Sequence, residues 1–325
     1  MVAKSAHGRE FGYDSQTNEI LFYGARYGLD LYGVPRARGR DYFVSSVIGA
    51  AGSSGKSYRE AVTTIALALA KCTASQGDRI ILLEGHVETI SSATALTLSK
   101  AGIEIVGLGR GTGRPTITLD TATDATINVT AARVKIRNVV FSANFADIVS
   151  FFTLTTAKYF SLESCRFQAT ATNMNALYVV DTNATTADAD GLSIENCIWV
   201  EPDLATVGWI KADGTNDNWK FNDNYSNLGV NNNKSLITVA TGKVITNLQM
   251  IRNRTIRLNT DTATGALLFG TDGSTNSGIV CDNYSQHADT AAELIVTASS
   301  GLSLFQNYSS GVNGNSGYII ATIDT

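Results

Sequence analysis

Two glutamates occupy matching places in this chain, and matched carboxylates are what glycosidic-bond chemistry requires. Glu163 and Glu195 each stand two residues before a cysteine. Cleavage of a glycosidic bond uses two carboxyl groups about 5–9.5 Å apart, so a fold that places these glutamates side by side would suit it. The series ends there, because other residues stand at, or within one position of, the later equivalent places: Asn222, Arg252 and Gln306. We therefore interpret the pair as part of a solvated face and predict no catalytic residue.

The remaining chemically capable residues form no convincing set. His86 and Glu88 are two residues apart on an expected turn, without a third metal ligand. The glycines between Gly107 and Gly113 lack the Gly-Lys-Ser/Thr of a phosphate-binding loop. Several aspartates stand in Gly- and Asn-rich stretches, where Asp commonly bonds its own turn backbone, and none of these loops has EF-hand spacing: Asp181, Asp188, Asp190, Asp213, Asp217 and Asp272. We expect no metal and no cofactor.

A short sequence motif, which we call the repeated phrase, recurs along the chain. Its fullest copies read apolar-x-apolar-x-x-(Cys/Asn)-x-aromatic, and the Cys or Asn is the sixth, or stacked, position. Its sixth position is spaced by 24 to 32 residues. The alternation of apolar residues has the period of a strand with one buried face. Such a repeat predicts one coil of a parallel β-solenoid, whereas a leucine-rich repeat would need a consensus leucine lattice that is absent. The sixth positions are Leu108, Val139, Cys165, Cys197, Asn224, Asn253, Asn283 and Asn307.

The sixth position predicts a ladder of side chains along one corner of the solenoid. Asn224, Asn253, Asn283 and Asn307 would bond their amides to the coils on either side. Cys165 and Cys197 occupy the same corner of two earlier coils. They are expected as small buried thiols, with a disulfide between adjacent coils as the alternative. Each of these asparagines also begins an Asn-x-Ser/Thr triplet, but stacking explains the recurrence better than glycosylation.

Composition and charge exclude several classes of protein. The net charge of −4 gives no general attraction to nucleic acid or to anionic membranes. Apolar runs are far shorter than a membrane span, and the first residues lack the apolar segment of a secretory signal. Four scattered cysteines without C-x-x-C spacing argue against a zinc site or a disulfide framework. We expect synthesis and folding in a reducing cytoplasm.

Residues 1–45 do not share the repeat. Their aromatic and arginine side chains are favoured interface anchors, so we predict an extended arm that docks on another surface, with a flap packed on its own solenoid as the alternative. The anchors are Tyr13, Phe22, Tyr23, Tyr27, Tyr32, Arg36, Arg38 and Arg40. Residues 46–75 are expected to form a linker and one amphipathic helix over 56–72, with a capping box of Ser57 and Glu60, covering the open end of a solenoid that occupies 76–325.

Two motifs carry a resemblance to a known family. Residues 77–90 run from Gly-Asp through a buried strand to Gly-His-Val-Glu, and residues 107–117 read Gly-Leu-Gly-Arg-Gly-Thr-Gly-Arg-Pro-Thr-Ile. The first motif, with the helix expected before it, resembles the opening of right-handed β-helix, or pectin-lyase-like, proteins, and is especially similar to a group of virion proteins of tailed bacteriophages. The second resembles a second-coil motif common across that fold. The resemblance implies an all-β right-handed parallel β-helix of about nine coils with a capping helix.

The same resemblance implies a structural role. It suggests a capsid decoration, or cement, protein on the exterior of a bacteriophage virion, made in the host cytoplasm, forming a homotrimer and binding the major capsid protein through its arm. The alternatives are a tailspike-like protein that binds or cleaves host surface polysaccharide, and a non-catalytic adhesin or minor tail protein. A tailspike would need aromatic side chains along a groove. Trp199, Trp209 and Trp219 are the nearest candidates, and we favour core packing for Trp199 and Trp219, which fall on the repeated phrase.

Overall fold

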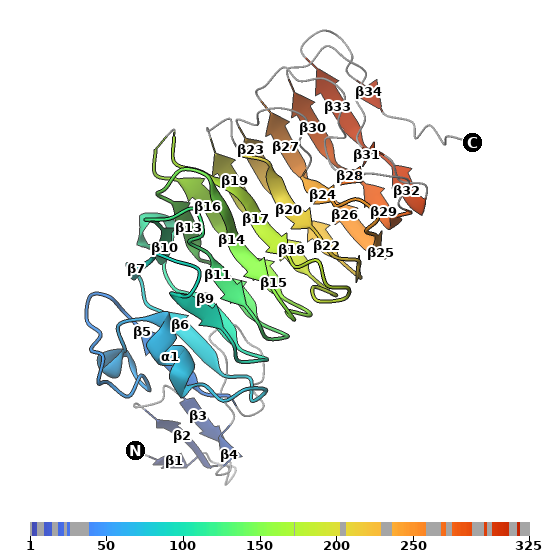
Figure 1. The fold of residues 1–325 in the computed structure, drawn as a ribbon. Helices are drawn as coiled ribbons and strands as arrows, with labels where there is room; N and C mark the ends of the chain where they lie inside the picture. Colours follow the sequence, from blue (N-terminus) through green and yellow to red (C-terminus); the bar gives the residue numbers. More distant parts are fainter. Residues whose placement is uncertain are drawn as a thin grey trace.

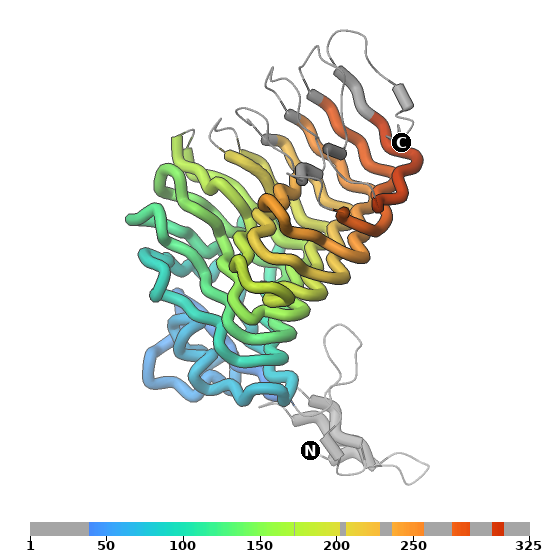
Figure 2. Tube along the Cα trace, turned by 45° about the vertical axis from the view of Figure 1, so that its right-hand side comes forward, coloured from blue at the N-terminus to red at the C-terminus, as the bar shows by residue number. Residues whose placement is uncertain are grey.

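The computed structural model describes residues 2–4, 10–14, 19–22, 25–26, 39–171, 173–201, 206–228, 236–257, 268–270, 275–287, 296–297, 301–311 and 317–318. The chain winds repeatedly around one axis, and each coil lies beside the next (Figure 1, Figure 2). Three parallel sheets run the length of this stack, and each coil contributes a strand to sheet I, then to sheet II, then to sheet III. The fold is the right-handed parallel β-solenoid that the repeat predicted.

The strands of each sheet follow one another in chain order. Sheet I contains β5 Asp41–Val44, β6 Arg79–Leu82, β9 Glu104–Gly107, β12 Lys135–Arg137, β15 Ser161–Glu163, β18 Ser193–Glu195, β22 Lys220–Asn222, β26 Leu248–Ile251, β29 Ser277–Cys281 and β32 Gly301–Phe305. Sheet II contains β7 Val87–Ile90, β10 Thr116–Leu119, β13 Val140–Ala143, β16 Arg166–Ala169, β19 Ile198–Glu201, β23 Tyr225–Leu228, β27 Arg254–Arg257, β30 Tyr284–His287 and β33 Tyr308–Gly311, with β34 Gly317–Tyr318 antiparallel to β33. Sheet III contains β8 Leu96–Leu98, β11 Ile127–Val129, β14 Ile148–Leu154, β17 Ala176–Thr182, β20 Gly208–Ala212, β24 Ile237–Val239, β28 Leu268–Gly270 and β31 Val296–Thr297. The expected total of about nine coils stays a prediction.

A short fourth pairing and three helical segments complete the solenoid. Strands β21 Asn216–Asp217 and β25 Ile245–Thr246 pair in the turns between sheets III and I. The helical segments are the 3-10 turns η1 Tyr58–Glu60 and η2 Gly111–Gly113, and the α-helix α1 Ile65–Lys71. Figure 1 shows α1 at the N-terminal end of the stack, where it packs against β5, β6 and β8.

The core lies inside the coil, where the apolar residues of the repeated phrase meet. On sheet I, Leu162 pairs in register with Ile136 of one neighbouring coil and Ile194 of the other, and all three are buried. Aromatic rings fill the middle of the stack, and Trp199 meets Trp209 edge to face at 5.6 Å between ring centroids. All three tryptophans are at most 1% exposed, so none is available at the surface to stack on a sugar.

The start of the solenoid differs from the prediction in two ways. Strand β5 pairs with β6, and Tyr42 and Val44 are buried, so the predicted boundary at residue 45 is wrong and the solenoid includes residue 41. The predicted helix over 56–72 begins only at Ile65. Ser57 makes no side-chain capping bond, and Val62 instead bridges to Val44, which holds this stretch extended. Thr64 is the N-cap, and its Oγ1 accepts a hydrogen bond from the Leu67 N–H at 3.3 Å.

Strands ahead of the solenoid form a sheet of their own. β1 Val2–Lys4, β2 Glu10–Asp14, β3 Glu19–Phe22 and β4 Ala25–Arg26 pair antiparallel in sequence order. Among the described strands, these four pair only with one another. The predicted arm therefore contains regular structure, where the sequence suggested an extended segment without periodicity.

Candidate functional site

The corner between sheets I and II has the same backbone in coil after coil. In the seven coils whose sheet I strands run from β12 to β32, a residue in the left-handed region follows the strand, and the next residue points inward at the stacked position. Non-glycine residues adopt this conformation at a cost, most readily Asn and Asp, and here it produces the sharp bend into sheet II. The bending residues are Asn138, Ser164, Asn196, Asp223, Arg252, Asp282 and Gln306, with φ between 52° and 58°.

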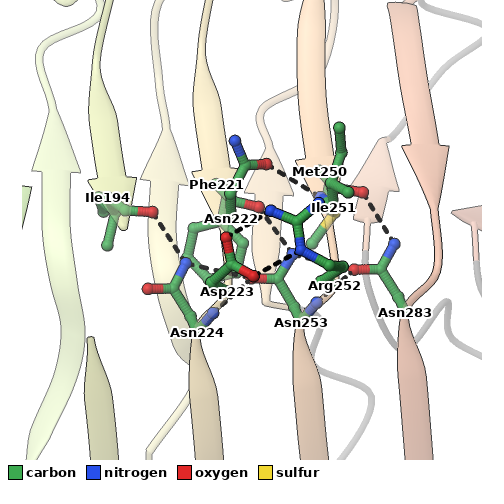
Figure 3. A network of polar contacts seen from close by, with 10 residues as sticks. All are labelled: Ile194, Phe221, Asn222, Asp223, Asn224, Met250, Ile251, Arg252, Asn253 and Asn283. Carbon is green, nitrogen blue, oxygen red and sulfur yellow. Dashed lines mark hydrogen bonds and ion pairs between the residues drawn. The ribbon is translucent and has the colours of Figure 1, made fainter. Parts of the chain in front are cut away.

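The four predicted asparagines form a continuous hydrogen-bonded row at the stacked position. Figure 3 shows Asn224, Asn253 and Asn283 of this row. Asn253 Nδ2 donates to the Phe221 carbonyl at 2.7 Å and to Asn283 Oδ1 at 2.9 Å, while its Oδ1 accepts from the Asn224 N–H at 3.0 Å. The same pattern recurs on the neighbouring coils, ending with Asn307 Nδ2 donating to the Val280 carbonyl at 2.8 Å. These amides are 0–3% exposed, so they join coils and contact no solvent-borne ligand.

Cys165 and Cys197 extend the same row towards the N-terminus as free, fully buried thiols. Cys197 Sγ lies 3.3 Å from the Glu195 carbonyl, and its backbone N–H donates to Asn224 Oδ1 at 2.9 Å, so the asparagine row begins on this residue. Burial raises the pKa of the Cys197 thiol well above its ordinary value, which keeps it protonated and unreactive.

Glu163 and Glu195 lie side by side on sheet I, as their matching places in the phrase predicted. Glu163 forms an ion pair with Lys135 across the sheet. Arg137, on the same strand as Lys135, pairs with Glu104 on β9 at 3.0 Å. Arg79 on β6 pairs with Asp41 on β5 at 2.9 Å. Opposite charges on neighbouring strands stabilise sheets, and the glutamates belong to this row of ion pairs.

A second group of charged residues lies on the outer face of sheet III. Lys211 on β20 is 3.6 Å from Asp181 Oδ1 on β17 and 2.6 Å from Asp213 Oδ2, which lies just after β20. The Asp213 backbone N–H is held by Thr182 Oγ1 at 3.0 Å, and Tyr178 stands on the same strand as Asp181. We refer to Tyr178, Asp181, Lys211 and Asp213 as the sheet III cluster.

Partial burial acts on the pKa of three side chains of this cluster, Tyr178, Asp181 and Lys211. Burial raises the pKa of Asp181, although the nearby Lys211 ammonium opposes the shift. Burial, followed by the charges of Asp181 and Asp213, raises the pKa of Tyr178 to about 12. Burial lowers the pKa of Lys211, but its bonds with Asp213 and Asp181 outweigh this and raise it overall. The cluster thus holds a firmly protonated lysine beside a carboxyl that protonates more readily than usual, a combination found at functional sites.

Sequence reasoning missed the sheet III cluster. It placed Asp181 in a turn, but Asp181 lies within strand β17. The repeated phrase covers sheet I and the corner, and gives no register for sheet III. Asp190 and Asp217 also differ from expectation, because they bond across coils: Asp190 Oδ1 accepts from the Asp217 N–H at 2.9 Å, and Asp217 Oδ1 accepts from Thr246 Oγ1 at 2.6 Å. Asp272 lies outside the described residues.

His86 and Glu88 tie the first coil to helix α1. His86 is fully buried; its Nδ1 accepts from the Ser46 N–H at 3.0 Å, so Nε2 carries the proton and faces Glu88 Oε2 at 3.2 Å. Glu88 Oε2 also accepts from the Ile65 N–H at 2.9 Å, at the start of α1. The pair therefore has a structural role in positioning the helix.

The predicted docking residues lie largely outside the described side chains. This holds for Tyr13, Phe22, Tyr23, Tyr27, Tyr32, Arg36 and Arg38. Arg40 is described, and its backbone N–H donates to Asp78 Oδ1 at 2.7 Å, which places it at the start of the solenoid and not in the arm. In the part of the chain that the structure describes, no group of three or more His, Cys, Asp or Glu residues is placed to hold a metal ion. No described helix has the length and apolarity of a membrane span.

Comparison with known proteins supports the fold and no more. No family model and no curated protein matches the chain. The solved structure of the pectate lyase Pel9A aligns over 84% of this chain and 70% of its own, with a TM-score of 0.54 at 12% identity. A rhamnogalacturonan lyase aligns over 87% of this chain and 90% of its own, with a TM-score of 0.40 at 11% identity. At such identity, the pectate lyase shares the β-helix fold, which unrelated activities also use.

Proposed function

We propose that this chain is a structural protein of a bacteriophage virion, most specifically a decoration protein on the capsid exterior. In this proposal the segment ahead of residue 39 binds the major capsid protein, and the solenoid of about nine coils, closed by α1, stands outward as part of a homotrimer. The observation that carries it is the separate pairing of β1–β4, because a segment that adds no strand to the solenoid is available to another surface.

The construction of the solenoid supports a structural role. Its corner row of buried amides and its ion pairs on sheet I connect one coil to the next, so these polar side chains are engaged in stacking. The resemblance of residues 77–90 to virion proteins supplies the assignment to a bacteriophage. Synthesis in the host cytoplasm is consistent with four buried cysteines that remain free.

Copy number and location in purified particles test this function. Hundreds of copies on the head, seen by quantitative mass spectrometry and cryo-electron microscopy, would support decoration, and a few copies at the tail would contradict it. A chain that starts at residue 39 should remain a folded solenoid and fail to bind capsids. Capsid binding by that truncated chain would refute the role of the N-terminal segment.

A second candidate is a tailspike-like protein that binds or cleaves host surface polysaccharide, and the sheet III cluster favours it. The ammonium of Lys211 suits an acidic sugar, and the raised pKa of Asp181 suits a proton donor to a leaving oxygen, with Asp213 as the second carboxylate. The pectate lyase that shares the fold acts on a polysaccharide, as its name states.

Reducing-end release from capsular polysaccharides of host strains tests the second candidate. Asp181→Asn and Lys211→Met should abolish release, whereas Lys158→Met, which removes the comparable Lys158–Asp190 pair at 3.3 Å on a turn, should not. Equal release by all variants would show that the cluster is not the site. Absence of release from every polysaccharide would leave the structural role as the better account.

A further inference from the structure

The outer face of sheet II from β16 to β33 has a composition unlike the other two sheets. The positions at the start of successive strands are Arg166, Ile198, Tyr225, Arg254, Tyr284 and Tyr308, and those two residues later are Gln168, Val200, Asn227, Ile256 and Gln286. The residues between these rows point inward and are buried: Phe167, Trp199, Ser226, Thr255 and Ser285. None of these outward positions is acidic, although the chain carries a net charge of −4.

Arg254 lies between two tyrosine rings on the coils to either side of it. Its guanidinium carbon is 6.0 Å from the centroid of Tyr225 and 5.5 Å from that of Tyr284. The register that aligns these residues continues to Tyr308, which is 47% exposed, while Ile198 at the other end is 40% exposed. Cation–π contacts of this kind hold a planar guanidinium in place while leaving its N–H groups at the surface.

The charge of Arg254 is not neutralised within the part of the chain that the structure describes. Arg252, two residues earlier, forms a bidentate pair with Asp223 at 2.7 Å, and Lys211 of the sheet III cluster and Lys135 of sheet I also face carboxylates. Arg254 has no ion pair among the described residues, and Arg166 is bonded only to the neutral Gln168, at 2.9 Å. Sheet II therefore presents two arginines without carboxylate partners amid tyrosines and amides.

We propose that this face binds an acidic polysaccharide, with Arg254 contacting a sugar carboxylate. Tyrosine rings and exposed aliphatic side chains provide apolar surface for sugar rings, and amide and phenol groups provide neutral hydrogen-bonding partners for hydroxyls. Guanidinium groups bind carboxylates through paired hydrogen bonds. Strands about 4.8 Å apart give the face a length of roughly 24 Å, enough for several sugars of an extended chain.

This inference deepens the second candidate function by placing glycan recognition on a face separate from the sheet III cluster. It is also compatible with a decoration protein, because a capsid surface that binds host glycan needs no cleavage. A second copy of this chain is the competing occupant. A face that carries Arg166 and Arg254 and no acidic residue is poorly suited to pair with the same face of a second copy, because like charges would meet across the symmetric contact.

Binding of the purified full-length protein to a glycan array provides the test. The array carries uronate- and sialate-containing, sulfated and neutral oligosaccharides. We expect retention on carboxylated glycans, weakened about ten- to a hundredfold by Arg254→Gln. Arg254→Lys should restore binding only in part, because lysine cannot form the paired contact. Arg133→Gln is the matched control, since Arg133 lies 5.4 Å from the centroid of Tyr159 on another part of the surface.

Three outcomes would overturn the proposal. The first is no retention on any carboxylated glycan, and the second is equal retention by Arg254→Gln and wild type. The third is a change of oligomeric mass in Arg254→Gln, measured by light scattering, without glycan binding, which would assign the face to a second copy. Lys211→Met separates this site from the sheet III cluster: it should keep array binding even where it abolishes polysaccharide cleavage.

Discussion

The stacked asparagines show how one residue type satisfies a corner that would otherwise leave backbone groups buried without partners. Each interior amide bonds to the coil before it and to the coil after it, so its donors and acceptors are used in full. Alanine would leave the preceding coil's N–H without a partner, and aspartate would bury a charge. The row is therefore specific for asparagine for a physical reason that applies at each coil.

Substitution of Asn253 should be costly. Asn253→Ala removes bonds to four backbone or amide groups that are nearly inaccessible to water, so we expect a loss of about 2–4 kcal/mol in the free energy of unfolding. Gln249→Ala, on the outer face of the same coil, should change stability by less than about 0.5 kcal/mol. Urea unfolding followed by circular dichroism measures both. Similar midpoints for the two variants would contradict the role assigned to the row.

Tyr178 should make stability depend on pH in the alkaline range. Burial, with the charges of Asp181 and Asp213, raises its pKa from 10.0 to about 12, so the folded state holds the phenolic proton more tightly than the unfolded state. This contribution is complete below pH 10 and is lost as the pH rises through about 12. Tyr178→Phe should therefore flatten the fall of the melting temperature over this range. Tyr58→Phe, at an exposed position, is the control, and an unchanged slope in Tyr178→Phe would exclude this explanation.

At the scale of elements, the start of helix α1 shows tertiary pairing overriding a local helix-capping signal. Ser57 and Glu60 have the spacing of a capping box, yet only the 3-10 turn η1 forms there, and the bridge between Val62 and Val44 interrupts any helix before Thr64. The face of α1 that contains Ile65, Ala68 and Leu69 is buried against the first coils. The start of α1 is thus set by the bridge to strand β5.

The two candidate caps can be distinguished directly. Thr64→Ala removes the bond to the Leu67 N–H and should cost about 1 kcal/mol. Ser57→Ala should have little effect, because Ser57 makes no side-chain capping bond. Thermal melting of both variants measures the difference. A larger loss in Ser57→Ala would mean that the helix begins earlier than Ile65.

Strand β29 requires glycine at position 278, where it packs closely against its neighbour β26. The φ of Gly278 is +137°, and an added Cβ would lie 2.1 Å from the carbonyl oxygen of Leu248 on the neighbouring strand. We expect Gly278→Ala to destabilise the protein by about 3 kcal/mol or more, because backbone must move. Gly242→Ala, at φ +69° with open space around it, should cost only about 1 kcal/mol. Hydrogen exchange of β26 and β29 should increase in the first variant only.

Much of the fold could be predicted from the sequence, because the repeated phrase contains both the period of a strand and the position of a corner. It placed Glu163 beside Glu195 and aligned the asparagines. It could not place Lys211 beside Asp181, since these residues lie on sheet III, where no equivalent phrase fixes which residues of successive coils meet. The repeated phrase also did not reveal that Tyr42 and Val44 belong to the core. They lie on strand β5, which precedes the first copy of the phrase and is too short to show a period of its own.

At the scale of the whole molecule, the chain divides into a solenoid and a segment ahead of it. Strand β5 completes sheet I, and the Arg79–Asp41 pair and the Arg40–Asp78 bond fasten it there. The strands β1–β4 add no pairing to that sheet. The boundary between the two parts therefore falls near residue 39.

Two truncations test this boundary. A chain that starts at residue 39 should keep the melting temperature of the full protein, because no strand of the solenoid is lost. A chain that starts at residue 46 lacks β5 and exposes Ile80 and Leu82, so we expect a clear fall in melting temperature or aggregation. Equal melting temperatures for the two truncations would place the boundary later in the sequence.

The left-handed residue that follows the sheet I strands from β12 to β32 limits how such a chain can diversify. A single inserted residue between Glu163 and Cys165 would rotate every later side chain of that coil to the opposite face. Among the described residues, the turns from sheet II to sheet III have no left-handed residue at a recurring place, and they differ in length from coil to coil. Evolution, or a protein engineer, can therefore lengthen those turns into new recognition loops on an unchanged framework. The corner between sheets I and II admits substitution at the bend but no change of length.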